Sequence, residues 1–104
     1  MDNLSTTLEK DLLTAKPTLV EFYDHNQLHS RETLPTDDKL RDHIGNRANL
    51  VLIDTSNSAN DPLAKKYHIH ATPTWILFVD GQEAWRTTGR LPLSELVDML
   101  HRFE

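Results

Sequence analysis

Residues 71–81, which read ATPTWILFVDG, decide the fold of this chain. Their central part, residues 74–79, is rich in aromatic and β-branched side chains and is typical of a buried strand. The dipeptide Asp80-Gly81 follows at once, and Asp-Gly is a strong signal for a tight turn between antiparallel strands. Residues 83–88 then supply the second strand. The sequence therefore predicts a β-hairpin in this region.

Two further strands are predicted upstream of the hairpin. Residues 18–24 form a nearly continuous apolar run that Glu21 interrupts, and residues 50–53 form a second run that Asp54 closes. Apolar runs without a polar alternation indicate strands that are covered on both faces. A segment of helical character separates these two runs, so we expect the strands to pair in parallel.

Helices are predicted in the first half of the chain from capping residues and prolines. A capping box at Thr6 and Glu9 opens a helix over residues 7–15. Residues 27–45 are polar with sparse apolar anchors, and Pro35 predicts either one kinked helix or two short ones.

In the second half, Asp61 is expected to be the N-cap of a helix, with Pro62 in its first turn and its end near Tyr67. A last helix is predicted to start within residues 91–94. The order of elements is then helix, strand, helix, strand, helix, strand, strand, helix. This order predicts a single α/β domain over residues 1–104, in which helices cover both faces of a mixed sheet of about four strands.

The composition excludes several classes of function. The net charge of −5 argues against nucleic acid or anionic membrane as the main partner, because both require a basic surface. No apolar run is long enough to cross a membrane, and the N-terminus has none of the regions of a signal peptide. Met1 as the native start would favour the cytoplasm, whereas a trimmed chain would favour a compartment outside it. The chain has no cysteine, which excludes disulfides, thiolate metal sites and cysteine catalysis.

The chain resembles the thioredoxin superfamily over about residues 4–103. The likeness is carried by ATPTW at residues 71–75, by the Asp-Gly turn with the later Gly89, and by LVEFYDHNQLHSR at residues 19–31. The basic residue directly after the loop is similar to periplasmic thiol–disulfide members of that superfamily. The resemblance implies a thioredoxin-like sandwich in which Pro73 is cis and faces the loop after the first strand. The family's usual first strand has no counterpart, because the capped helix begins almost at Met1.

The residues that carry the family's chemistry are replaced. The family needs a Cys-x-x-Cys pair at a helix N-terminus, where the helix dipole lowers the pKa of the first thiol. The matching positions are Gln27 and Ser30, and the lysine that partners the family's buried acid is matched by Leu50. Glutamine is not a nucleophile, and Ser30 has no evident activating base. We therefore expect no thiol–disulfide exchange, no catalytic residue and no cofactor.

A groove between two loops remains as the expected site of function. In the resembled family it binds an extended peptide through backbone hydrogen bonds of the residue before the proline, and this needs no thiol. We expect a redox-inactive module with a chaperone-like, assembly or scaffold role, whose partner is another protein or an extended peptide segment. The expected groove residues are Asn26, Gln27, Leu28, His29, Ser30, His70, Ala71, Thr72 and Pro73.

Alternative functions use other residues. In the resembled fold His25, His29 and His70 could come close, and three imidazoles can hold zinc or copper. No HExxH or similar motif supports a metal site, and solvated or locally hydrogen-bonded histidines are the simpler interpretation. Trp85 lies on the expected edge strand, either packed or as an exposed contact for a partner. A further alternative is a domain that only forms a homodimer, through its edge strand or the face of Trp85, and has no groove function. Glu21 is expected to be a buried acid, either hydrogen-bonded to a neighbour or with a pKa raised by burial.

Overall fold

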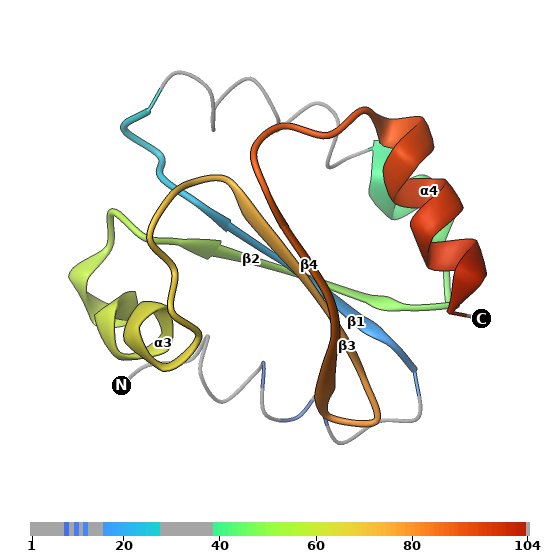
Figure 1. Cartoon of the computed structure of the whole chain (residues 1–104), viewed down its shortest axis with the longest axis horizontal. Helices are drawn as coiled ribbons and strands as arrows, with labels where there is room; N and C mark the ends of the chain where they lie inside the picture. The colour runs from blue at the N-terminus through green and yellow to red at the C-terminus, as the bar shows by residue number, and fades with distance from the viewer. Residues whose placement is uncertain (1–7, 9, 11, 13–15, 28–38, 104) are drawn as a thin grey trace.

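The computed structural model describes residues 8, 10, 12, 16–27 and 39–103. The predicted kink at Pro35 and the groove residues Leu28, His29 and Ser30 lie outside the described residues. At the centre is a four-stranded sheet with the order β2-β1-β3-β4 (Figure 1). The strands are β1 (Thr18–Tyr23), β2 (Asn49–Asp54), β3 (Thr74–Val79) and β4 (Gln82–Thr88).

The pairing of the strands confirms the predicted mixed sheet. β1 and β2 are parallel, whereas β3 pairs antiparallel with both β1 and β4. Both residues of the turn between β3 and β4 have positive φ, 54° at Asp80 and 78° at Gly81. This is the geometry that short hairpins favour, and it explains why Asp-Gly stands at this position.

Helices cover both faces of the sheet, because successive side chains of a strand point to opposite sides. On one face, Leu19 and Leu77 pack with α4 (Leu93–Arg102) and with the helical residues 39–44. On the other face, Val20 and Ile76 belong to a second core with Leu8 and with α3 (Asp61–Lys66). Figure 1 shows α3 and α4 on opposite sides of the sheet. The predicted α/β sandwich is therefore confirmed.

The start of α3 differs from the prediction by one residue. A short 3-10 helix, η1 (Ser58–Asn60), runs directly into α3, and the side chain of Asn57 accepts a hydrogen bond from the backbone of Ala59 at its start. Asp61 already has helical angles, φ −56° and ψ −42°, so it is the first residue of α3 and not its N-cap. The N-cap is Asn60. A preceding 3-10 turn is not visible as an apolar pattern, which is why the sequence misplaced the cap.

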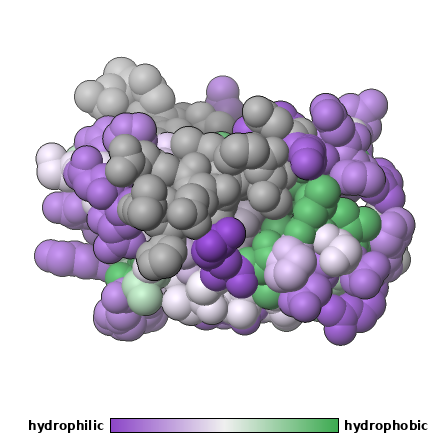
Figure 2. Space-filling view, turned by 90° about the horizontal axis from the view of Figure 1, so that it is seen from above, coloured by the Kyte–Doolittle hydropathy of each residue, from purple (hydrophilic) through white to green (hydrophobic). Residues whose placement is uncertain are grey.

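Among the coloured residues of Figure 2, hydrophilic side chains predominate, and the larger apolar patch lies toward the end where α4 lies. None of the helices in the described part of the chain has the length and apolar composition that crossing a bilayer requires.

Candidate functional site

Loops from three strands meet at one end of the sheet. β1 and β2 are parallel, so their carboxyl ends lie together, and β3 runs the opposite way, so its first residue lies there too. Residues 24–27 follow β1, residues 55–57 follow β2, and residues 68–73 precede β3. We call residues 24–27 the loop wall and residues 68–73 the proline wall.

A direct hydrogen bond joins the two walls. The hydroxyl of Thr72 donates to Oε1 of Gln27 at 2.6 Å, across 45 residues of sequence. A pocket of about 220 Å³ lies between the walls. It is lined by Asp24, Gln27, Thr55, Ala64, Ile69, His70, Ala71 and Thr72. The structure therefore brings together the parts of the expected groove that it describes, Gln27 and residues 70–72; Asn26 is exposed beside them.

The proline wall is fixed at its ends and open in its middle. The Thr72–Pro73 peptide bond is cis, as the resemblance implies, and the carbonyl of Pro73 accepts from the N–H of Gly89 at 2.8 Å. The hydroxyl of Thr74 donates to the carbonyl of Ala71 at 2.6 Å. Among the described residues, nothing accepts a hydrogen bond from the N–H groups of residues 70–72 or donates to the carbonyl of Thr72. Such groups can bind the backbone of a ligand.

Asp54 holds the loop wall against the end of β2. Its Oδ1 accepts hydrogen bonds from the backbone N–H of His25 at 3.1 Å, and from the backbone N–H and hydroxyl of Ser56 at 2.9 and 2.7 Å. Burial acts to raise the pKa of Asp54 and is the largest single influence. The hydrogen bonds from Ser56 and His25 together outweigh it, so the pKa lies below its ordinary value.

A helix C-cap positions the start of the proline wall. The N–H of His68 donates to the carbonyl of Lys65 at 3.2 Å, and the N–H of Ile69 donates to the carbonyl of Ala64 at 2.9 Å. This is the Schellman pattern, and His68 takes the left-handed position with φ 56°. Glycine is the usual residue there, since a side chain at positive φ is strained. The chain turns sharply at His68, and residues 69–73 then follow the groove.

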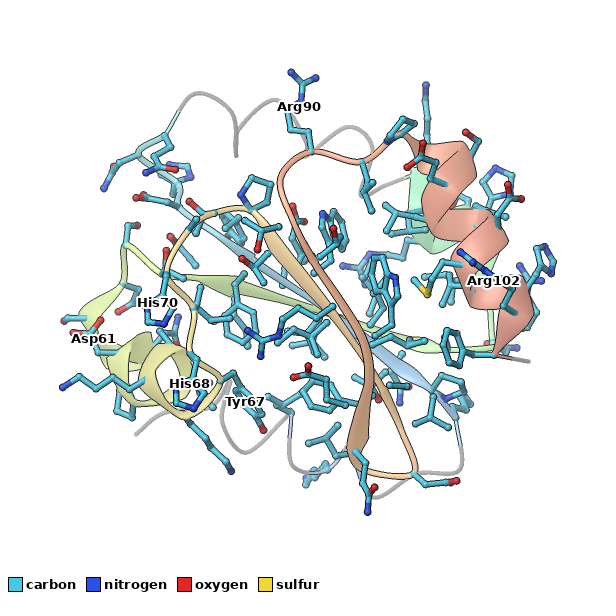
Figure 3. All side chains as sticks on the ribbon, viewed as in Figure 1. Asp61, Tyr67, His68, His70, Arg90 and Arg102 are labelled. Atoms are coloured by element: carbon cyan, nitrogen blue, oxygen red, sulfur yellow. The ribbon has the colours of Figure 1, made fainter. Side chains whose placement is uncertain are left out.

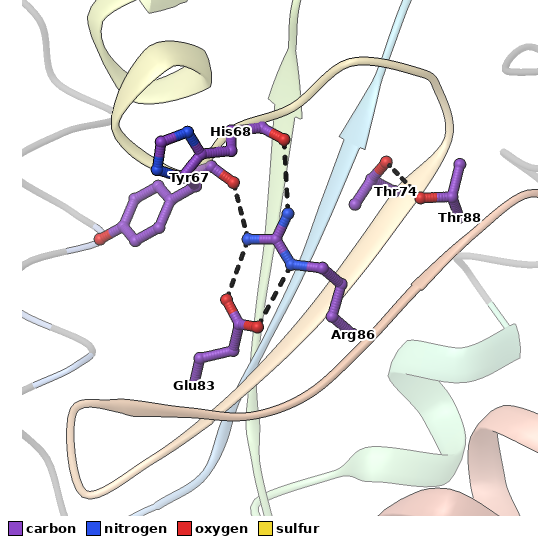
Figure 4. Close-up of polar contacts among 6 residues, drawn as sticks. All are labelled: Tyr67, His68, Thr74, Glu83, Arg86 and Thr88. Carbon is purple, nitrogen blue, oxygen red and sulfur yellow. Dashed lines mark hydrogen bonds and ion pairs between the residues drawn. The ribbon is translucent and has the colours of Figure 1, made fainter.

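Arg86 on β4 fixes the same C-cap from outside (Figure 4). Its guanidinium donates to the carbonyl of Tyr67 at 2.6 Å and to that of His68 at 3.4 Å. It also binds Glu83 in a two-pronged ion pair, with distances of 2.9 and 3.2 Å. These bonds satisfy carbonyls that a helix end leaves without intrahelical partners. The edge strand thereby holds the proline wall in place.

Glu21 is completely buried, which confirms the expectation of a buried acid. The strand register gives the neighbours of Glu21 in the sheet. Leu52 is the β2 residue beside Glu21, whereas Leu50 lies beside Leu19. On the other side Glu21 is paired with Trp75, which is 1% exposed and belongs to the core and not to the groove. Glu21 does not line the pocket between the walls.

The histidines do not gather into a metal site in the described part of the chain. No group of three metal-ligating side chains is found there, and His29 lies outside it. His25 is exposed on the loop wall. His70 lines both the groove pocket and a neighbouring pocket of about 390 Å³ that also contains His68 and Asp61. Figure 3 shows His68 and His70 beside α3, at the opposite side of the molecule from Arg102.

Trp85 is partly buried on the edge strand β4 and packs against the core on the side of α4. It lines a separate cavity of about 340 Å³ with residues of α4, among them Met99 and Arg102. Its position on an edge strand is confirmed. A partner contact through Trp85 stays a prediction.

Sequence reasoning missed several residues of the site. Asp24 and Thr55 line the pocket, and Asp54 anchors the loop wall, although the sequence marked Asp54 only as the end of a strand. The carboxyl ends of neighbouring parallel strands form ligand crevices in α/β sheets, and this signal could have identified all three. Ala64 contributes from α3, which only the packing of that helix reveals.

Comparisons with known proteins agree with this fold. The thioredoxin family model matches residues 2–102. The chloroplastic thioredoxin Y of Oryza sativa subsp. japonica is 31% identical over 85 residues, which cover 82% of this chain and 49% of that protein. The thioredoxin of Rhodospirillum rubrum is 28% identical over 93 residues, which cover 88% of each chain. The chain spans about half the length of the chloroplastic thioredoxins Y that it matches.

Solved structures show the same architecture. The thioredoxin of Fasciola hepatica superposes with a TM-score of 0.80 at 22% identity, covering 97% of this chain and 91% of that one. A mutant thioredoxin of Halobacterium salinarum gives a TM-score of 0.83 at 23% identity, covering 94% and 83%. At this identity the likeness establishes the fold alone. The further likeness to periplasmic members stays a prediction.

Proposed function

This chain belongs to the thioredoxin family, and we propose that it acts there as a redox-inactive module that binds an extended segment of another protein. The ligand lies in the groove between the loop wall and the proline wall. Its backbone pairs with the backbone of residues 70–72, as an added strand pairs with a sheet edge. Such binding requires no chemical reaction, and it fits a chaperone-like, assembly or scaffold role.

The observation that carries the proposal is the open backbone of the proline wall. N–H groups of residues 70–72 face no partner among the described residues, although a pocket of about 220 Å³ lies beside them. Backbone groups that stay unpaired are normally satisfied by solvent or by a ligand. The hydrogen bond from Gly89 and the Schellman turn hold these groups in one geometry, so little ordering is required when a peptide binds.

The loss of redox chemistry follows from the residue types at the loop wall. Thiol–disulfide exchange requires a thiolate nucleophile, and the chain contains no cysteine. Gln27 instead accepts a hydrogen bond from Thr72, so it links the two walls at the position where the family places its first thiol. A glutamine amide offers a donor and an acceptor to a peptide backbone but no covalent step.

The test uses a peptide selected from a random library for binding to the wild-type chain. Thr72→Arg should fill the groove beside Gln27 and lower the affinity for that peptide at least about tenfold. The matched control is Gln82→Arg, which adds the same side chain at the exposed, opposite end of the hairpin and should leave affinity unchanged. Affinity is measured by fluorescence anisotropy, and thermal melting checks that both variants fold. Equal affinity of folded Thr72→Arg and wild type would remove the groove as the binding site.

A further inference from the structure

The two edges of the sheet are protected to different degrees. β4 carries the charged residues Glu83 and Arg86, and its pairing with β3 shifts register between Leu77 and Phe78. Charges and bulges of this kind discourage pairing with another strand. β2 reads NLVLID and has no charged residue before Asp54. An uncharged apolar edge strand is a surface for strand pairing.

The hydrogen bonds of β2 define which of its groups face outward. The N–H of Asn49 donates to Pro17 and the N–H of Thr55 donates to Tyr23, at 2.8 and 2.6 Å. In a parallel ladder the residues that bond to one neighbour alternate with those that face away. The backbone groups of Leu50 and Leu52 therefore point away from β1. Among the described residues nothing bonds to these outward groups.

We propose that β2 pairs antiparallel with β2 of a second copy of this chain, around a two-fold axis that passes through Val51. Leu50 of each copy then exchanges both backbone hydrogen bonds with Leu52 of the other copy. The two sheets become one continuous sheet, and the two grooves lie at its opposite ends. This assembly is independent of the proposed groove function.

The register around Val51 follows from three features. Leu50 and Leu52 lie on the same face of the sheet, so pairing one with the other keeps both faces in alignment and covers two partly exposed leucines. An axis through Leu52 would instead require the carbonyl of Asp54, which already accepts from the side chain of Asn60 at 2.9 Å. Antiparallel pairing also brings the start of β2 toward the end of β2 in the second copy, and the residues at these two ends, Arg47 before the strand and Asp54 at its end, carry opposite charges.

The absence of cysteine allows a direct test of this register. Directly opposite residues that do not bond to each other have Cα atoms about 4.5 Å apart, within the range of a disulfide. Val51→Cys should therefore form a disulfide-linked dimer under mild oxidation. Ile53→Cys is the matched control, because it is equally buried, on the same face, and would lie opposite Asn49. Equal cross-linking of both variants, or of Leu52→Cys in preference to Val51→Cys, would overturn the proposed register.

Sedimentation of the wild-type chain over a concentration series should show a monomer–dimer equilibrium. Leu52→Pro removes an outward N–H without touching the ladder to β1, and should raise the dissociation constant about tenfold or more. Gln82→Pro, at the start of the other edge strand β4, should leave the dissociation constant of the dimer unchanged. A wild-type chain that stays monomeric to millimolar concentration refutes the proposal, whatever the folding of the variants.

Discussion

The two walls of the groove face each other but are held by different kinds of contact. The loop wall depends on side chains, since Asp54 accepts from His25 and Gln27 accepts from Thr72. The proline wall depends on backbone geometry, namely the Schellman turn at His68 and the cis bond before Pro73, with Arg86 bound to its carbonyls. A single substitution can remove a side-chain contact, whereas a backbone conformation is held by several contacts at once. A substitution in the loop wall should therefore act through one or two side-chain contacts, whereas the proline wall depends on several backbone contacts at once.

The largest effect is expected from the proline wall, at Arg86. Arg86→Ala removes bonds to the carbonyls of Tyr67 and His68 and should lower the free energy of unfolding by about 2 kcal/mol. Urea denaturation measures this loss. Arg86→Lys keeps the positive charge but lacks the planar guanidinium that binds two acceptors at once, so it should recover only part of the lost free energy of unfolding. Glu83→Gln should cost less than about 1 kcal/mol, because its side chain is 42% exposed. If Arg86→Ala had the stability of the wild type, the proline wall would keep its conformation without the bonds from Arg86.

A smaller effect is expected from the loop wall, at Asp54. Asp54→Asn keeps an acceptor oxygen but loses the charge, and should cost about 1 kcal/mol or less at neutral pH, because solvent screens this partly exposed group.

The pH dependence has a definite sign. The pKa of Asp54 is lower in the folded chain than the ordinary value of 3.8 for an aspartate. The stability that its charge contributes is therefore complete above that value and is lost as pH falls through the folded pKa. The difference in stability between wild type and Asp54→Asn should shrink in acid below about pH 4. A constant difference from pH 7 to pH 2 would assign the effect to something other than ionisation.

The smallest effect is expected at the left-handed position of the proline wall. His68→Gly relieves the strain of a side chain at φ 56° and should raise the free energy of unfolding by about 0.5 kcal/mol. Asp80→Gly is the matched control, because Asp80 has φ 54° in a turn far from the groove. Peptide affinity should fall only for His68→Gly if the imidazole contributes to binding. Equal affinity of both variants would make His68 a structural residue alone.

Much of the fold could be predicted because its signals are local. The strand over residues 74–79 and the turn at Asp80-Gly81 depend on neighbouring residues, and the structure has both as predicted. The groove was predicted less completely. Gln27 and residues 70–72 were identified from a resemblance, but Asp54 and Thr55 become site residues only when β2 lies beside β1.

By itself, the sequence determined the strands, the hairpin turn and the absence of a thiol, since each depends on residue type or on short-range pattern. The cis bond before Pro73 was expected only from the resemblance to the family. Only the tertiary structure decided that Leu52 and not Leu50 lies beside Glu21, and that Arg86 reaches the end of α3. These contacts join segments far apart in the chain. They depend on strand register and helix packing, where a shift of one residue moves every side chain to the other face.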